Sequence, residues 1–116
     1  MAERRVCRVE DLPPGEMKIV PGGRWGIGLF NRGGSVYALN NYCPHAGAPV
    51  CRGPVTGTTA SESSYDSRWV REGDILRCPW HGWEFDISTG QSVAEPVRRV
   101  KTYPVKIVEG WIVIEG

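Results

Sequence analysis

The sequence lacks any apolar run long enough to cross a membrane. A spanning helix needs about 18 or more consecutive apolar residues, and every apolar stretch here is interrupted well before that length. The N-terminal residues 1–15 have no apolar segment after Arg4 and Arg5, so they do not form a secretory signal peptide. We therefore expect a cytoplasmic protein with no membrane partner, whose cysteines stay reduced.

The sequence also lacks an excess of basic over acidic residues or of acidic over basic ones. The 14 Lys and Arg residues nearly balance the 13 Asp and Glu residues and leave a net charge of +1. Such a balance gives no general attraction to nucleic acid, so we expect no nucleic-acid partner. Nucleotide-binding glycine loops are absent as well, because "GGRWGIG" at 22–28 fits neither the dinucleotide-binding nor the Walker spacing.

Long helices are excluded by frequent breaks, since 15 Gly and 9 Pro are spread along the 116 residues. Short runs rich in Val, Ile, Tyr and Trp lie between the breaks and predict strands. The predicted strands are 4–9, 16–20, 24–30, 35–39, 65–70, 74–78, 83–87, 99–107 and 111–114. The pattern is typical of an all-β fold, a small antiparallel sandwich or barrel formed by residues 1–116 as a single domain.

Turns and loops are predicted where small, polar or Gly/Pro-rich residues gather. "REGD" at 71–74 indicates a hairpin between the strands 65–70 and 74–78. Residues 43–54 contain several Pro and Gly and are expected to form a loop, and "TGTTASESS" at 56–64 is expected to form an exposed one.

The only two histidines of the chain each lie close to a cysteine. Cys43 and His45 have one residue between them, whereas Cys78 and His81 have two. Thiolate and imidazole are ligands for zinc or for an iron–sulfur cluster. A structural zinc site would use all four in a tetrahedron, although its ligand pairs usually have wider spacing than Cys-x-His. A [2Fe–2S] cluster in which two His replace two Cys instead needs two similar loops that each carry both ligand types, and this sequence has them.

The two boxes "CPHAGAPVC" and "CPWHGWEFDISTG" resemble the cluster-binding boxes of Rieske [2Fe–2S] proteins of the ferredoxin and ring-hydroxylating oxygenase type. The terminal "YPVKIVEGWIVI" is also similar to that family. The resemblance implies one Rieske-type [2Fe–2S] cluster per chain. It further implies that Cys43 and Cys78 bind the inner iron, while His45 and His81 bind the outer iron at the exposed end.

The same resemblance implies a Rieske-like fold with a loop-rich cluster-binding part at about 41–86. Family members usually have a shorter segment between the two boxes. The additional residues fall within 56–74 and are expected to form an enlarged loop or hairpin, as a plain surface insertion or as part of a docking surface.

Residues near the second box predict a low redox potential. High-potential Rieske proteins of cytochrome bc complexes carry hydroxyl donors two and four residues after the second histidine, where this chain has Trp83 and Phe85. Trp80 replaces the cysteine that a loop-linking disulfide would need. We therefore expect a potential near the low end of the Rieske range, about −150 mV. Cys7 is expected to be a core residue and Cys51 to pack under the first loop.

The histidine count limits the possible functions. A mononuclear oxygenase iron needs two His and a carboxylate, and the resemblance already assigns both histidines to the cluster. We therefore expect no catalytic residues and no enzyme activity of the chain alone. The expected function is a one-electron carrier between a flavin-dependent reductase and a terminal oxygenase or similar enzyme. The alternatives are a small Rieske subunit of a larger reductase, of the nitrite reductase type, and a zinc-stabilised interaction module.

Overall fold

Ten antiparallel strands form the structure, a computed structural model that describes residues 3–44, 47–63, 66–80, 82–93 and 98–115, with only the backbone described within 57–72. The strands are β1 (Glu3–Arg8), β2 (Met17–Val20), β3 (Ile27–Arg32), β4 (Ser35–Asn40), β5 (Val55–Ser63), β6 (Asp66–Arg77), β7 (Glu84–Asp86), β8 (Thr102–Tyr103), β9 (Val105–Val108) and β10 (Trp111–Glu115). Within the described residues the only helices are the single 3₁₀ turns η1 (Val9–Asp11) and η2 (Val50–Arg52). The predicted all-β class is confirmed.

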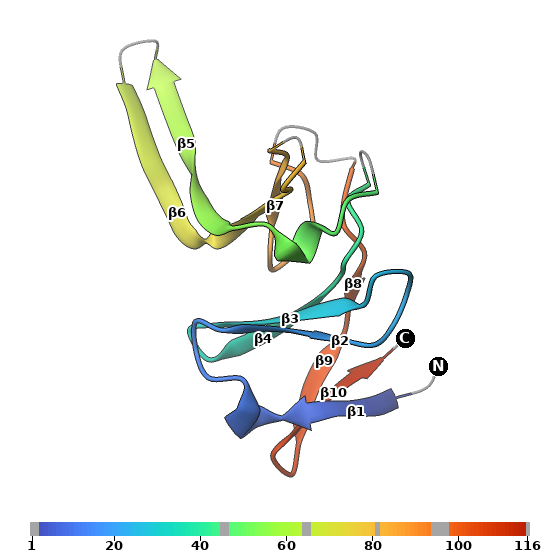
Figure 1. Ribbon diagram of the computed structural model, residues 1–116. Coiled ribbons are helices and arrows are strands. Elements are labelled where there is room, and N and C mark those ends of the chain that lie inside the picture. Colours follow the sequence, from blue (N-terminus) through green and yellow to red (C-terminus); the bar gives the residue numbers. More distant parts are fainter. Residues whose placement is uncertain (1–2, 45–46, 64–65, 81, 94–97, 116) are drawn as a thin grey trace.

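The strands are arranged in three small sheets. Their orders are β1-β10-β9, β2-β3-β4-β8 and β5-β6-β7. Figure 1 shows the sheet of β1, β9 and β10 at one end of the molecule and the sheet of β5, β6 and β7 at the other. The segment between β4 and β5 and the segment between β6 and β7 therefore lie toward the end of the molecule that is away from the chain termini.

Strand β3 separates two hydrophobic cores. Successive side chains of a strand point to opposite faces, and Leu29 and Phe30 accordingly pack in different clusters. The same holds for Ala38 and Leu39 of β4. Each fully buried Leu or Phe side chain contributes roughly 1.5–3 kcal/mol relative to an exposed one. The sheet that contains β3 thus joins the half with the two predicted ligand boxes to the half with the chain termini.

The hairpin predicted from 65–70 and 74–78 is wrong, because both runs belong to the single strand β6. Thr56 pairs with Ile75 and Thr58 with Val70, so residues 71–74 form a wide irregularity opposite one residue of β5. Gly73 adopts a positive φ of 88° there, which a residue without Cβ reaches at no steric cost. "REGD" therefore bends a strand and does not reverse the chain.

The exposed loop predicted at 56–64 is also wrong, because β5 covers most of it. Backbone pairing with β6 runs from Val55 opposite Leu76 to Ser63 opposite Asp66. Figure 1 shows this hairpin extending beyond the other strands. A loop prediction based on the polarity of Ser and Thr misses a strand whose backbone is paired with a partner.

The predicted strand 99–107 is divided at Pro104. Before it, β8 pairs with β4 through Thr102 opposite Leu39. After it, β9 pairs with β10 in a different sheet, with Val105 opposite Ile114. Proline has no N–H to donate to a ladder, so the chain changes sheets at this residue.

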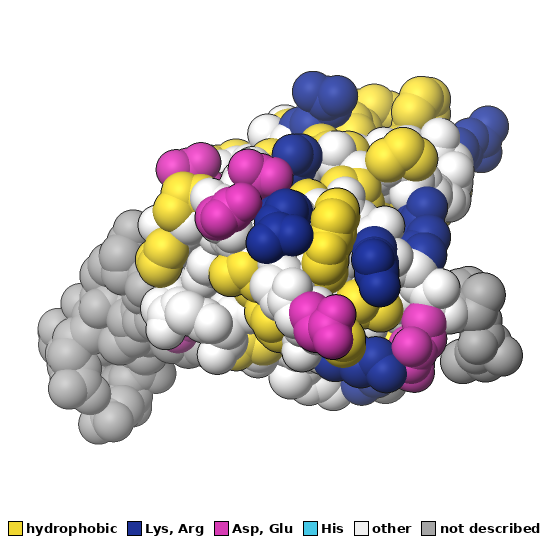
Figure 2. All heavy atoms as spheres, turned by 90° about the horizontal axis from the view of Figure 1, so that it is seen from below, with side chains coloured by type: hydrophobic (Ala, Val, Ile, Leu, Met, Phe, Trp, Pro, Cys, Tyr) yellow, Lys and Arg dark blue, Asp and Glu magenta, His cyan; other side chains and the backbone are white. Residues whose placement is uncertain are grey.

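The surface near the chain termini mixes both charge signs with apolar side chains. Figure 2 shows Lys and Arg side chains interspersed with Asp and Glu on this face. Ile107 is 51% exposed and Val108 is 39% exposed on the adjoining edge strand β9. This face presents no single-sign patch that would attract a polyanion.

Candidate metal centre

The two predicted thiol ligands lie in one core. The side chains of Cys43 and Cys78 are 0% and 1% exposed, and both belong to the cluster that contains Phe30 and Phe85. Cys43 follows β4 after a short connection, and Cys78 follows β6 directly. All four cysteines of the chain are buried, with at most 6% of their surface exposed.

The two cysteines predicted as ligands begin backbone turns that are closed by the same pair of hydrogen bonds. In the first ligand turn, 43–48, the Cys43 N–H donates to the Ala48 carbonyl at 2.8 Å, and the Gly47 N–H donates to the Cys43 carbonyl at 2.8 Å. In the second ligand turn, 78–83, the Cys78 N–H donates to the Trp83 carbonyl at 2.7 Å, and the Gly82 N–H donates to the Cys78 carbonyl at 3.0 Å.

A glycine at the fifth position makes both turns possible. Gly47 has φ +74° and Gly82 has φ +73°, a left-handed conformation that costs other L-residues about 1–2 kcal/mol. The two turns therefore match in their first residue, their fifth residue and both closing hydrogen bonds. Two matched loops that each begin with a buried thiol are what a cluster bound from two sides requires.

The two predicted imidazole ligands, His45 and His81, lie outside the described residues. By sequence, His45 occupies the third position of the first ligand turn and His81 the fourth position of the second. Among the residues that the structure describes, no group of three or more His, Cys, Asp or Glu gathers around one point. The donor set still fits a mixed Cys/His cluster, because each turn contributes one buried thiol and contains one imidazole.

At Gly53, the segment that follows the first ligand turn packs closely against the start of the second ligand turn. The Arg77 N–H donates to the Pro54 carbonyl at 3.0 Å. A Cβ on Gly53 would lie 1.7 Å from the Arg77 carbonyl oxygen and 3.1 Å from Cδ of Pro79. Sequence reasoning missed this residue, because nothing in "CRGPV" distinguishes a close backbone approach from an ordinary loop glycine.

A buried amide side chain supports the start of the first ligand turn. Asn41 is fully buried, its Nδ2 donates to the Trp25 carbonyl at 3.1 Å, and its Oδ1 accepts the Cys51 N–H at 2.8 Å. It thereby ties the β2–β3 connection to η2 across the residues that precede Cys43. Sequence reasoning missed Asn41 too, since an Asn in a loop is most often a solvated turn residue.

The two remaining cysteines are core residues, as predicted. Cys7 is 6% exposed and packs in the second cluster, whereas Cys51 is 0% exposed and packs in the first. The Cys51 thiol donates to the Leu39 carbonyl at 3.6 Å, and burial raises the pKa of this thiol to about 12. Cys51 is therefore an uncharged packing residue beneath the first ligand turn.

The raised pKa predicts that Cys51 resists alkylation in the folded protein. A shift from 9.0 to about 12 lowers its thiolate fraction at pH 8 about a thousandfold relative to the unfolded chain, before burial slows the reagent further. Because the thiolate is the reactive form, labelling of the folded protein should rise about tenfold per pH unit while the pH remains below the raised pKa. Iodoacetamide labelling followed by peptide mass spectrometry measures this, with urea-unfolded protein as the control. Equal labelling of Cys51 in folded and unfolded protein would contradict the assignment.

The two tryptophans of the second box lie in different environments. Trp80 is 59% exposed. Trp83 packs partly buried against the first core cluster, stacks on Phe85 with ring centroids 6.5 Å apart, and has the Arg98 guanidinium 5.5 Å from its ring centroid. Trp83 therefore belongs to the core packing, whereas Trp80 presents an exposed aromatic surface within the second ligand turn.

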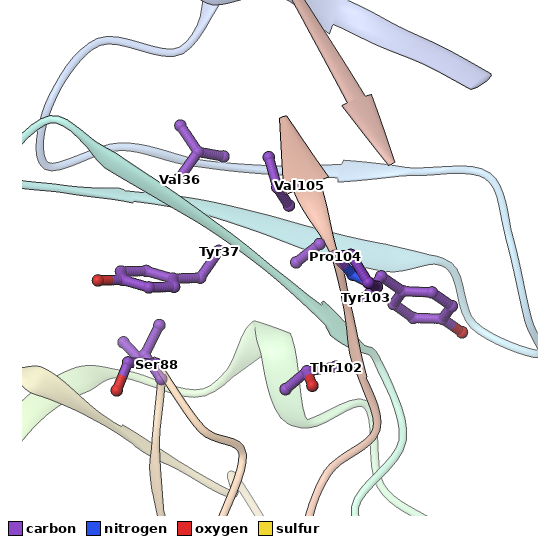
Figure 3. Close-up of a pocket in the computed structure, with 9 residues that line it drawn as sticks. Val36, Tyr37, Ser88, Thr102, Tyr103, Pro104 and Val105 are labelled. Carbon is purple, nitrogen blue, oxygen red and sulfur yellow. The ribbon is translucent and has the colours of Figure 1, made fainter. Parts of the chain in front are cut away.

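A surface cavity of about 480 Å³ lies apart from the ligand cysteines. Figure 3 shows Tyr37, Ser88 and Val105 among the side chains around it. The lining residues come from β4, from the turn after β7, and from β8 and β9. The cavity therefore lies between the two halves of the fold and takes no part in the candidate metal centre.

Among the described residues, no helix is long and apolar enough to cross a membrane.

Comparison with known proteins identifies the family. The profile of the Rieske [2Fe-2S] domain matches residues 3–104. Over 89 residues the chain is 39% identical to apoptosis-inducing factor 3 of Mus musculus and Homo sapiens, but it spans only 12% of the length of those proteins. It is 31% identical over 100 residues to the ferredoxin component of the naphthalene 1,2-dioxygenase/salicylate 5-hydroxylase systems of Ralstonia sp, covering 85% of this chain and 81% of that protein.

A solved structure agrees with this match over the full length. The ferredoxin of Sphingomonas yanoikuyae B1 superimposes with a TM-score of 0.72 at 31% identity, covering 99% of both chains. The matched ligand turns, the donor set and these likenesses together lead to one conclusion: the chain belongs to the Rieske [2Fe–2S] domain family, whose cofactor is a [2Fe–2S] cluster.

Proposed function

We propose that this protein is the ferredoxin component of a ring-hydroxylating dioxygenase system, which carries one electron at a time from a flavin-dependent reductase to a terminal oxygenase. The observation that carries the proposal is the pair of matched turns, each beginning with a buried cysteine in the same core. The likeness to ferredoxins supports it, since this chain spans 81% of the length of the Ralstonia sp ferredoxin component and 99% of the Sphingomonas yanoikuyae B1 ferredoxin. The cytoplasm is the proposed location.

The proposed ligands are one cysteine and one histidine from each turn. Cys43 and Cys78 bind the inner iron, and their burial in the core protects the thiolate end from solvent. His45 and His81 bind the outer iron at the end where electrons enter and leave. When bound, the cluster supplies reversible one-electron chemistry, and the protein positions it and sets its potential. The proposed single domain is residues 1–116, with the cluster-binding part at about 41–86.

The environment of the second ligand turn supports a low potential. Phe85 is 0% exposed within the core and carries no hydroxyl group, and Trp83 stacks against it. Neither side chain can donate an O–H hydrogen bond to a cluster sulfur. Because hydrogen bonds to sulfur stabilise the reduced state, fewer of them lower the potential.

We expect a redox titration of anaerobically purified protein to show a mixed Cys/His [2Fe–2S] EPR signal with a midpoint near the low end of the Rieske range, about −150 mV. Iron and zinc counted on the same sample give the metal identity. A midpoint at the high end of the range would contradict the argument from Trp83 and Phe85. Colourless protein with stoichiometric zinc would overturn the electron-carrier function.

A further inference from the structure

We propose that each charge of the Arg77–Glu84 ion pair acts on the potential of the cluster, with Arg77 raising it and Glu84 lowering it by similar amounts. This inference rests on the proposed function, because it requires a bound cluster. It adds a role for two residues that are not cluster ligands.

The pair lies at the base of the second ligand turn. Arg77 ends β6 immediately before Cys78, and Glu84 begins β7 immediately after the turn closes at Trp83. The two residues are direct cross-strand partners. Their side chains meet at 3.0 Å between Nη2 of Arg77 and Oε2 of Glu84. Both charged residues therefore directly flank the second ligand turn, which contains one proposed thiol ligand and one proposed imidazole ligand.

Partial burial lets these charges act on the cluster. The side chain of Glu84 is 22% exposed and that of Arg77 is 44% exposed. Nε of Arg77 is buried and has no hydrogen-bond partner, so this end of the guanidinium is shielded from water. Charges with less water around them are screened less by solvent and salt than exposed ones.

The sign of each effect follows from the charge that reduction adds. One electron makes the cluster more negative by one unit, so a nearby cation stabilises the reduced state and a nearby anion destabilises it. With the pair intact, the two contributions largely cancel. Loss of Glu84 removes an anion and should raise the potential, whereas loss of Arg77 removes a cation and should lower it.

A purely structural role would give a different pattern. If the pair only held the turn closed, removing either partner would loosen the same turn and shift the potential in the same direction. Opposite shifts for the two single variants, with recovery in the double variant, therefore distinguish charge tuning from loop support.

A second ion pair, in the sheet farthest from the ligand turns, serves as a matched control for the change in charge. Glu3 of β1 pairs with Lys106 of β9 at 2.5 Å, and its carboxylate is 44% exposed. This sheet lies at the end of the molecule opposite the ligand turns (Figure 1). Glu3→Gln makes the same change in charge as Glu84→Gln, so it measures any general effect of net charge.

The experiment is an EPR-monitored titration of the holoprotein and of the variants E84Q, R77Q, R77Q/E84Q and E3Q. E84Q should raise, and R77Q should lower, the equilibrium constant for one-electron reduction by roughly tenfold, which is about 59 mV. The double variant should return close to the parent value and E3Q should not depart from it. An unchanged EPR line shape and iron content confirm an intact cluster in each sample.

Shifts of the same sign for E84Q and R77Q, or no shift in E84Q with an intact cluster, would overturn this inference alone. If R77Q fails to assemble, the comparison of E84Q with E3Q still tests the sign. A parent protein without a [2Fe–2S] signal would instead overturn the proposed function and this inference with it.

Discussion

Cys78→Ala should abolish cluster binding and give a colourless protein without a Rieske EPR signal, and Cys43→Ala should do the same. Each substitution removes one of the two thiolates proposed for the inner iron, and alanine offers no replacement ligand. Both side chains lie in the core at the start of matched turns, so no neighbouring water-exposed group can take their place. Visible absorption and iron content of anaerobically purified protein measure the effect.

The two other buried cysteines are matched controls. Cys7→Ala and Cys51→Ala remove the same atom from a comparably buried position. They should retain the full iron content and lose about 1 kcal/mol of stability, as expected for a small deletion in a core. The ligand assignment would be wrong if Cys78→Ala kept its colour, or if Cys51→Ala lost the cluster as completely as Cys78→Ala does.

Gly53→Ala should lower the free energy of unfolding by about 3 kcal/mol or more, because the added methyl group would overlap backbone that has no space to move. Its Cβ would lie 1.7 Å from the carbonyl oxygen of Arg77, whose own N–H is bonded to Pro54. Relief requires separating the segment after the first ligand turn from the second turn. We therefore expect a reduced iron content together with the lower stability, measured by urea unfolding and metal analysis.

Gly33→Ala is the comparison variant for Gly53→Ala. Gly33 has φ +63° but no atom within 4 Å of the position of an added Cβ. Its substitution should therefore cost only the strain of a left-handed alanine, about 1–2 kcal/mol, and should leave the iron content unchanged. An equal loss of stability in the two variants, with the cluster retained in both, would show that the contact at Gly53 does not hold the two ligand turns together.

Local patterns were sufficient to predict the fold class and the family's cluster, and they supply the proposed ligand set. Two Cys/His pairs with flanking Pro and Gly are a rare combination, and their chemistry permits few metals. Short β-branched and aromatic runs between Gly and Pro predict strands, and all nine predicted runs overlap strands of the structure. The core positions of Cys7 and Cys51 followed from their apolar or loop-covered surroundings.

Pairing between distant segments was harder to predict. Residues 56–64 look like a loop because Ser and Thr are polar, yet most of them form β5 by bonding to β6. "REGD" resembles a turn, but in the structure these residues form an irregularity in the pairing within strand β6. Both errors arose because a strand is defined by its partner, and turn propensity is read from a few neighbouring residues.

From the amino-acid sequence alone we could propose the cluster ligands and predict a chain built of short strands. How these residues are held in place depends on the folded chain. Only the fold shows that the turns 78–83 and 43–48 close with the same hydrogen bonds, that Gly53 packs against Arg77, and that Arg77 pairs with Glu84. Ligand identity is a property of single residues, whereas close approach, burial and charge pairing depend on segments that meet only after folding.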